Sequence, residues 1–158
     1  MLRWNGWRFD GQEPLINLDD AYNWAQLNDE WPGTDYDGTS VRAGMKYLQR
    51  QGLITGYHWA YDNNTIINAL LYNGPVAVGT MWTMDMFITN GRGFTRPTGE
   101  DVGGHAYLLD GVNTRHKFYR FKNSWGRNWG RYGHGYITFD DFDILLKNWG
   151  EAAIATRT

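Results

Sequence analysis

Residues 103–106 of this chain read Gly-Gly-His-Ala, and residues 123–130 read Asn-Ser-Trp-Gly-Arg-Asn-Trp-Gly. Between these motifs, residues 105–112 and 117–122 have the apolar and aromatic composition of two strands, with a turn at residues 113–114. A hairpin of this kind would return the asparagine to the side of the histidine. An amide oxygen there can accept a hydrogen bond from one imidazole nitrogen and fix the tautomer, which leaves the other nitrogen free to take a proton.

Three neighbouring residues are expected to support this pair. Trp125 would cover the bond between Asn123 and His105 from water, which strengthens such a bond. Gly126 would let the backbone turn tightly beside the indole rings, and Gly104 directly precedes the histidine. A histidine beside a hairpin is more often structural than catalytic, and an Asn-Ser-Trp-Gly segment can also serve only as a hairpin corner. Both interpretations are therefore kept open.

Four segments have the spacing of apolar residues that is typical of helices. Each begins after a side chain that can cap it, and the first three end at glycine or proline. The predicted helices span residues 18–28, 41–51, 65–72 and 141–149, with N-caps at Asn17 or Asp19, Thr39 or Ser40, Asn63 or Asn64, and Asp140.

The remaining segments favour strands and loops. Residues 53–60 are predicted to be extended, and residues 76–82 are predicted as a strand buried on both faces. Residues 89–104 are rich in glycine and threonine and are predicted as a loop. Residues 135–139 and 152–155 are predicted as strands, the last one at an edge of the sheet.

The order of these elements predicts the fold class. Helices come first and strands later, which is typical of an α+β domain with helices to one side of an antiparallel sheet. A length of 158 residues fits one domain over residues 1–158, with a mainly helical part over residues 1–75 and a mainly sheet part over residues 76–158. The content of 42% hydrophobic and 20% charged residues indicates a globular chain rather than a disordered one.

The two motifs resemble those of a known family. Gly-Gly-His-Ala and Asn-Ser-Trp-Gly resemble the catalytic histidine and catalytic asparagine motifs of papain-like cysteine peptidases. Residues 74–76, Gly-Pro-Val, resemble a strand entry of that family, and residues 38–42, Gly-Thr-Ser-Val-Arg, resemble a helix of its bacterial and phage branch. The similarity covers about residues 18–156. It implies a papain-like fold in which a helical N-terminal half packs on a C-terminal antiparallel sheet or half-barrel.

The resemblance also implies roles for single residues. It makes His105 and Asn123 the catalytic pair, and it places Gly38 and Trp59 in the substrate cleft. The aromatic segment 57–61 fits equally an aromatic plug between the two halves, which is the favoured interpretation. It implies no cofactor. The four histidines lack the spacing of metal ligands, and His134, which stands between two glycines, is predicted to cap a turn.

The nucleophile of this family is absent, because the sequence contains no cysteine. A thiol peptidase attacks with a thiolate, which in the family stands at the start of a long central helix, shortly after an oxyanion-hole glutamine. Gln12 and Gln26 are followed by no cysteine, and Ser40 and Ser124 lie outside the helix in question. Residues 1–6 are predicted as the last turns of a truncated central helix. The catalytic pair is therefore predicted to be vestigial in this chain.

Three functions follow as hypotheses. The first is a catalytically inactive binding or structural module, for example one associated with a phage virion. The second is the C-terminal portion of an active cysteine peptidase whose cysteine lies on another chain or upstream of Met1. The third is a glycan- or peptide-binding module that uses a tryptophan-rich surface at Trp4, Trp7 and Trp31.

Charge and hydropathy narrow the class of partner. A net charge of −2 gives no general attraction to nucleic acid or to anionic lipid. The N-terminus lacks the apolar core of a signal peptide, and no apolar run is long enough to span a membrane, so a cytoplasmic or virion-associated location is expected. A helical half without its central helix would expose an apolar face. We therefore expect a protein partner that contacts residues 1–9.

Overall fold

The computed structural model describes residues 2–3 and 16–156, in which most helices come early in the chain and most strands later. Their order is β1 (Leu2–Arg3), α1 (Leu18–Leu27), α2 (Val41–Arg50), β2 (Gly56–Trp59), α3 (Asn63–Tyr72), β3 (Val76–Thr83), the 3-10 helix η1 (Met84–Phe87), β4 (Asp101–Asn113), β5 (Phe118–Lys122), β6 (His134–Thr138), α4 (Phe139–Lys147) and β7 (Glu151–Thr156). The α+β class predicted from the sequence is confirmed.

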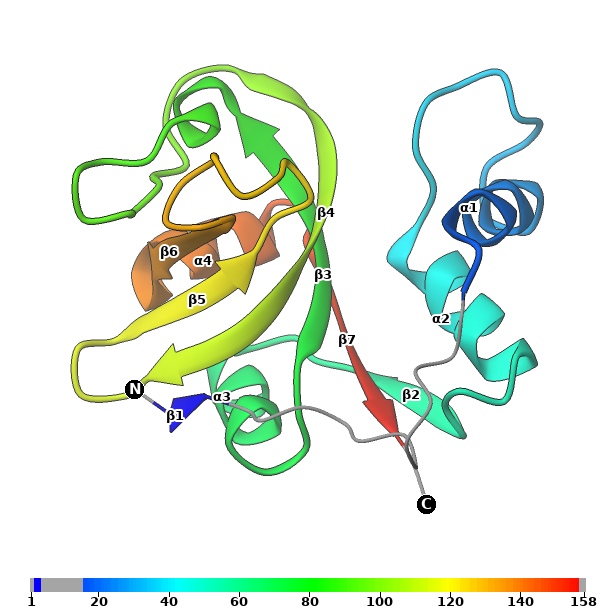
Figure 1. Cartoon of the computed structure of the whole chain (residues 1–158), viewed down its shortest axis with the longest axis horizontal. Coiled ribbons are helices and arrows are strands. Elements are labelled where there is room, and N and C mark those ends of the chain that lie inside the picture. Colours follow the sequence, from blue (N-terminus) through cyan, green and yellow to red (C-terminus); the bar gives the residue numbers. More distant parts are fainter. Residues whose placement is uncertain (1, 4–15, 157–158) are drawn as a thin grey trace.

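One antiparallel sheet organises these elements (Figure 1). Its strand order is β2-β7-β3-β4-β5-β6, and the short β1 pairs with β4. The β3–β4 pairing is the longest, from Val76 opposite Leu109 to Thr83 opposite Asp101. Figure 1 places α1 and α2 together on one side of β7, away from β5 and β6. The predicted packing of helices on an antiparallel sheet is therefore confirmed, but the helices cover both faces of the sheet and not one side only.

The first two helices begin where the sequence predicts. Asn17 Oδ1 accepts hydrogen bonds from the backbone N–H groups of Asp19 and Asp20 at the start of α1. Ser40 Oγ accepts from the N–H of Ala43 at the start of α2, at 3.1 Å. Each cap satisfies a donor that the helix itself leaves unpaired.

The other two helices use different caps from those predicted. Asp62 caps α3 by accepting from Thr65 N at 2.8 Å, and Thr138 caps α4 by accepting from Asp141 N at 3.1 Å. Asn63, one of the predicted caps, is the first residue of α3, and its side chain contacts Tyr119 of β5 and the backbone carbonyl of Phe139, the first residue of α4. The capping predictions for these two helices are wrong. At α3 the reason is that long-range contacts occupy the Asn63 side chain, and at α4 the helix begins one residue before Asp140.

Both faces of the sheet carry a hydrophobic core. On one face, Leu70 of α3 and Phe142 of α4 join a large cluster built on β3, β4, β5 and β6. On the other face, Met45 of α2 and Ile54 pack on Ala153 of β7. Burying a side chain as large as that of Phe142 contributes roughly 2–3 kcal/mol. The two cores together hold α2, α3 and α4 against the sheet.

β3 separates these two cores, and its residues alternate between them. Every second residue from Val76 to Trp82 is buried, and those between are half-buried. The prediction of full burial on both faces is therefore wrong for the face that α2 covers. At Gly79, an added Cβ would lie 2.9 Å from Cγ2 of Val41, so the glycine allows α2 to approach the strand closely.

Two strand predictions are corrected. The predicted loop over residues 89–104 is wrong for its last four residues, since β4 begins at Asp101 and continues to pair with β3. The glycines that suggested a loop are tolerated within the ladder, and Gly103 adopts a φ of +138° there. The predicted edge strand at residues 152–155 is interior, because β2 pairs with the outer side of β7.

The N-terminal prediction is also corrected where the structure describes it. Leu2–Arg3 forms a strand paired with Val112 and Gly111 of β4, and not a helical turn. The rest of the predicted helical remnant, and residues 4–9 of the predicted partner-contacting segment, lie outside the described residues.

Candidate active site

His105 and Asn123 meet at one end of the β4–β5 hairpin. His105 stands in β4 opposite Thr80 of β3, and Asn123 directly follows β5. The register of the hairpin, with Leu108 opposite Lys122, carries the residue after β5 towards the start of β4. His105 Nε2 and Asn123 Oδ1 are consequently 2.8 Å apart.

The orientation of the Asn123 amide assigns the proton on the imidazole. The backbone N–H of Ser124 donates to the same Asn123 Oδ1 at 2.8 Å, so this atom is the amide oxygen. An oxygen there can only accept, and His105 Nε2 must therefore be the donor. A neutral His105 then carries its lone pair on Nδ1, to which no described side chain or backbone group is hydrogen-bonded. Such a ring can take a proton at Nδ1.

Burial sets the protonation of this ring. Burial lowers the pKa of His105 below the ordinary histidine value of 6.5, and the hydrogen bond to Asn123 opposes part of that decrease. The imidazole is consequently neutral at neutral pH. This is the state in which it can act as a base.

Aromatic rings surround the imidazole. The ring centroids of Trp82 and Trp125 lie 4.6 and 4.9 Å from that of His105. Trp82 is buried, whereas Trp125 is 36% exposed and stacks on Phe87 of η1 at 5.2 Å. The sequence interpretation missed Trp82, which it treated as part of a core strand. It also missed Phe87, because nothing local marks a residue of a short helix that contacts a distant turn.

Glycines shape the segment that carries Trp125. Gly126 has a φ of +79° and open space where a Cβ would lie. Gly130 has a φ of +56°, and an added Cβ would overlap the carbonyl oxygen of His134. Gly104 lies in β4 opposite Met81, with nothing within 4 Å of an added Cβ. Positive φ therefore requires the first two glycines, and Gly130 is in addition required by close packing.

Two buried donors at this site lack partners. The indole Nε1 of Trp82 and Nδ2 of Asn123 are not hydrogen-bonded to any described residue. Each such donor costs about 1–3 kcal/mol. Unpaired buried polar groups are rare in native proteins, and ordered water or a functional role accounts for those that occur.

Trp59, a predicted cleft residue, lines a small pocket of about 110 Å³. The pocket lies between α2, β2 and β7, and its lining is Arg42, Trp59, Ala60, Tyr61, Gly150, Glu151 and Ala152. Neither His105 nor Gly38 is part of that lining. The pocket is nevertheless close to the histidine along the sheet. Glu151 of β7 pairs with Gly79 of β3, and the next residue of β3, Thr80, lies opposite His105.

Of the two charged residues that line this pocket, one has an ion-pair partner and the other has none among the described residues. The guanidinium of Arg42 lies 5.2 Å from the Trp59 ring centroid, and its Nε is 3.5 Å from Glu30 Oε1, which also contacts Lys46 at 3.7 Å. Glu151, in contrast, forms no ion pair with any described residue. The pocket therefore offers one carboxylate free of a counter-ion beside an aromatic side chain. The sequence interpretation did not single out this glutamate.

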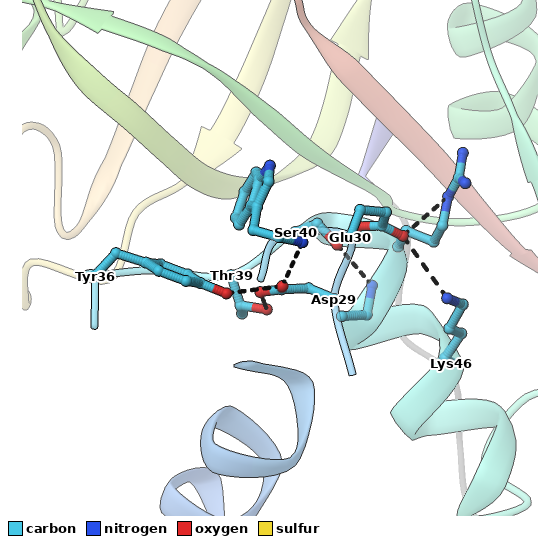
Figure 2. Close-up of polar contacts among 9 residues, drawn as sticks. Asp29, Glu30, Tyr36, Thr39, Ser40 and Lys46 are labelled. Atoms are coloured by element: carbon cyan, nitrogen blue, oxygen red, sulfur yellow. Dashed lines mark hydrogen bonds and ion pairs between the residues drawn. The ribbon is translucent and has the colours of Figure 1, made fainter. Parts of the chain in front are cut away.

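A polar network orders the segment before α2 (Figure 2). The carboxylate of Asp29 accepts hydrogen bonds from Trp31 N at 3.0 Å, the Tyr36 hydroxyl at 2.8 Å and Thr39 Oγ1 at 2.9 Å. Burial raises the pKa of Asp29, but the three hydrogen bonds together outweigh this effect, so the pKa lies below the ordinary value of 3.8. Burial and the neighbouring Asp29 raise the pKa of Tyr36 to about 12. Both groups keep their hydrogen-bonding states at neutral pH.

Gly38, the other predicted cleft residue, lies within this ordered segment. It has a φ of +102°, and its N–H donates to the hydroxyl of Tyr22 in α1 at 2.8 Å. Gly38 thus ties α1 to the start of α2. Gly38 is not among the residues that line the Trp59 pocket.

Neither a metal cluster nor a membrane-spanning helix is found in the described part of the chain. Among residues 2–3 and 16–156, no group of three or more His, Asp or Glu side chains could hold a metal ion. None of the helices described is long and apolar enough to cross a membrane.

Comparison with models of known protein families identifies the family of this chain. The family model described as papain family cysteine protease matches residues 16–148, which include both His105 and Asn123. This chain belongs to the papain family. As a papain family chain it is distinctive in composition, since none of its 158 residues is a cysteine.

Curated papain family relatives match only in part. An uncharacterized peptidase C1-like protein of Acanthamoeba polyphaga mimivirus is 24% identical over 61% of this chain and 45% of its own length. A cysteine proteinase of Theileria annulata is 34% identical over 44% of this chain and 17% of its own length. The chain thus spans less than half the length of either relative.

Solved structures share the fold. Digestive procathepsin L 3 of Tenebrio molitor aligns with a TM-score of 0.60 at 18% identity, over 77% of this chain and 49% of that protein. Xylellain, a cysteine protease from Xylella fastidiosa, aligns with a TM-score of 0.55 at 23% identity, over 77% of this chain and 46% of that protein. The papain-like fold predicted from the sequence is therefore confirmed.

Proposed function

We propose that this chain forms the imidazole half of a papain-type peptidase site, inactive by itself and able to activate a cysteine supplied from outside the 158 residues. The observation that carries the proposal is the His105–Asn123 pair, at 2.8 Å, with its tautomer fixed and Nδ1 free of any described hydrogen-bonding partner. A residual structural motif would not need that nitrogen to stay available.

The chemistry assigned to the pair is proton transfer. A thiol placed at His105 Nδ1 would give its proton to the ring, and Asn123 would hold the resulting imidazolium through Nε2–H. The thiolate would then attack a peptide carbonyl. Without a thiol this sequence of steps has no nucleophile, and removing the nucleophile of a triad enzyme costs on the order of a million-fold in rate. The chain alone should therefore not cleave peptides.

Complementation tests this proposal. The chain is co-expressed with a fragment of a papain family protease that carries the catalytic cysteine and its helix, and the purified pair is assayed with a fluorogenic peptide and an epoxide thiol inhibitor. We expect no hydrolysis from the chain alone, hydrolysis and labelling from the pair, and loss of hydrolysis with His105→Ala. A stable complex that neither cleaves nor becomes labelled would contradict the proposal and leave an inactive module.

The gene gives an independent test of where the cysteine comes from. A reading frame that continues upstream of Met1 into a glutamine followed shortly by a cysteine would identify its source. An in-frame stop codon there would require a second polypeptide.

A second candidate function is peptide binding without cleavage, favoured by the Trp59 pocket. The Glu151 carboxylate, which forms no ion pair with any described residue, suits a cationic group that gains a counter-ion there. The Arg42 guanidinium already lies over the Trp59 ring, so Trp59 serves as an apolar wall of the pocket. The volume of about 110 Å³ suits the end of one side chain. We assign to this pocket the basic side chain of a bound peptide.

Titration calorimetry with acetyl-arginine amide tests this assignment. The uncharged analogue acetyl-citrulline amide should bind at least about tenfold more weakly, since a charged contact is worth on the order of 1.5–3 kcal/mol. Glu151→Gln should remove the preference, while Glu100→Gln, outside the pocket lining, should retain it. Equal binding of both ligands would contradict the assignment.

Other roles remain predictions. Of the tryptophans suggested for glycan binding, Trp4 and Trp7 lie outside the described residues, and Trp31 is half-exposed with its ring edge-on to Tyr36. Loss of glycan-array binding on mutating Trp31 would support that function. The protein partner for residues 1–9 and a virion-associated role rest on the sequence arguments alone.

A further inference from the structure

A cluster of charged side chains lies on β4, β5 and β6, next to the segment that carries Asn123. It begins at a β-bulge. Leu109 pairs with Phe121 and Gly111 pairs with Arg120, so Asp110 is one extra residue in β4. Bulges of this kind redirect a side chain, and the Asp110 side chain, 17% exposed, turns towards β5 and β6.

Arg120 fixes the orientation of this carboxylate. Its Nε and Nη2 donate to Asp110 Oδ1 and Oδ2 at 2.8 and 2.7 Å, which is a bidentate pair. Both side chains are largely buried, at 13% and 17% exposure. Bidentate pairs are geometrically specific, so Asp110 Oδ2 is held in place for a second partner.

That second partner is His134, the first residue of β6. Its Nε2 lies 3.3 Å from Asp110 Oδ2, and its Nδ1 lies 3.2 Å from the carbonyl oxygen of Tyr132. Both ring nitrogens therefore face an oxygen, and a protonated ring donates to both. His134 thereby links the bulge in β4 to the turn that leads into β6.

This turn is strained and is connected to the candidate site. Tyr132 has a φ of +56°, an uncommon conformation for a residue with a side chain. The next residue, Gly133, has a φ of +82°, and its carbonyl accepts the N–H of Asn123 at 3.0 Å. Strained residues persist where the surroundings hold them. The contact of His134 with the Tyr132 carbonyl supplies such a constraint.

We propose that Asp110 and His134 are positioning residues, which hold the strained Tyr132–Gly133 turn and thereby fix Asn123 for its hydrogen bond with His105. The link runs from Asp110 through the His134 ring to Tyr132, and from the Gly133 carbonyl to the backbone of Asn123. The proposal concerns the geometry of the pair and goes beyond the proposed peptidase role, because the bond is present whether or not a thiol is supplied.

NMR on the whole chain tests it through the solvent exchange rate of the His105 Nε2 proton. With His134→Ala we expect roughly tenfold faster exchange, which corresponds to about 1.4 kcal/mol and falls within the strain of one left-handed residue. Asp110→Asn should shift the rate in the same direction. Tyr132→Gly relieves the strain, so the double variant with His134→Ala should return towards the original rate. Tyr132 is 71% exposed, and its removal loses little packing.

A matched control separates positioning from stability. Thr138→Ala removes the N-cap of α4 and lowers stability, but it should leave the exchange rate of the His105 proton unchanged. The proposal is overturned if a folded His134→Ala variant exchanges at the original rate. It is equally overturned if Tyr132→Gly fails to restore the rate, or if Thr138→Ala accelerates exchange as much as His134→Ala does. None of these readouts depends on peptidase activity.

Discussion

The state of His105 results from two opposing effects on one ring. Burial lowers its pKa, and the hydrogen bond to Asn123 raises it, with burial the larger effect. The same hydrogen bond directs the free lone pair to Nδ1. Three residues therefore produce a neutral base with a fixed tautomer. Ser124 N orients the Asn123 amide, and the amide oxygen then accepts a hydrogen bond from His105 Nε2.

Changing Asn123 should move the pKa of His105 in a predictable direction. Asn123→Ala removes the hydrogen bond that favours the charged ring, so the pKa should fall further. Asn123→Asp places a negative charge beside the ring, so the pKa should rise. NMR titration of the His105 ring protons measures both shifts. A rise with alanine or a fall with aspartate would contradict the account of this bond.

The lowered pKa also predicts how stability depends on pH. The folded state has the lower pKa, so it binds fewer protons than the unfolded state as pH falls below the ordinary histidine value of 6.5. The free energy of unfolding should therefore be highest above that pH and should decrease as pH falls towards the folded-state pKa. Urea unfolding of the original chain and of His105→Gln, above pH 7 and near pH 5, isolates this contribution. A steeper decrease in the His105→Gln variant would exclude it.

At this scale the sequence predicts the pair but not its surroundings. His105 and Asn123 stand in recognisable motifs, and a hairpin between them fixes their approach. Trp82 and Phe87 act through contacts with residues far along the chain, and Asp110 acts from a β-bulge within the hairpin. No local pattern marks such contacts.

Among the elements, the turn between β5 and β6 depends most on single residues. It contains three left-handed glycines, Gly126, Gly130 and Gly133, and the left-handed Tyr132. Gly130 is enclosed by its own turn, whereas Gly126 faces open space. The two glycines therefore provide a matched comparison.

Gly130→Ala should destabilise the chain more than Gly126→Ala. Both substitutions place a Cβ on a left-handed residue, which costs about 1–2 kcal/mol. At Gly130 the Cβ also meets the backbone of His134, so a total of about 3 kcal/mol or more is expected. Thermal unfolding of the two variants measures the difference. Equal losses would show that the enclosure of Gly130 has no energetic consequence.

Element prediction succeeds where the pattern is local. Asn17 and Ser40 cap the helices that they precede, and the strands near residues 76, 118 and 135 are found within a residue or two. It finds β7 as a strand but wrongly places it at the edge of the sheet, because the pairing of β2 outside it is a long-range event. It also fails at the start of β4, where pairing with β3 outweighs a glycine-rich composition.

For the whole molecule, α2 packs on the sheet through the second hydrophobic core and through one especially close contact. Gly79 of β3 and Val41 of α2 meet at a point where no Cβ fits without displacement. The contact lies beside Thr80, the residue opposite His105. The arrangement of the helical part thus depends on the absence of a side chain at the sheet centre.

A double-mutant cycle tests this contact. Gly79→Ala should destabilise the chain by roughly 1–3 kcal/mol through overpacking. In the Val41→Ala background the same change should cost clearly less, because the interfering methyl group is gone. Chemical unfolding of the four proteins gives the coupling free energy. Additive losses would show that α2 does not rest on Gly79.

The papain-like architecture could be predicted from the motifs and the order of elements. The short strand β1 could not be predicted, since two residues carry no periodicity and Leu2–Arg3 is extended because it pairs with β4. Nor could the pocket at Trp59, which forms only when α2, β2 and β7 come together.

The central claim is that His105 is a neutral base whose Nδ1 is ready to receive a proton. Nitrogen-15 NMR of the His105 ring in the whole chain at neutral pH tests it directly. We predict a protonated Nε2 that is hydrogen-bonded to Asn123 and an unprotonated Nδ1. A ring protonated at Nδ1, or at both nitrogens, would contradict the claim.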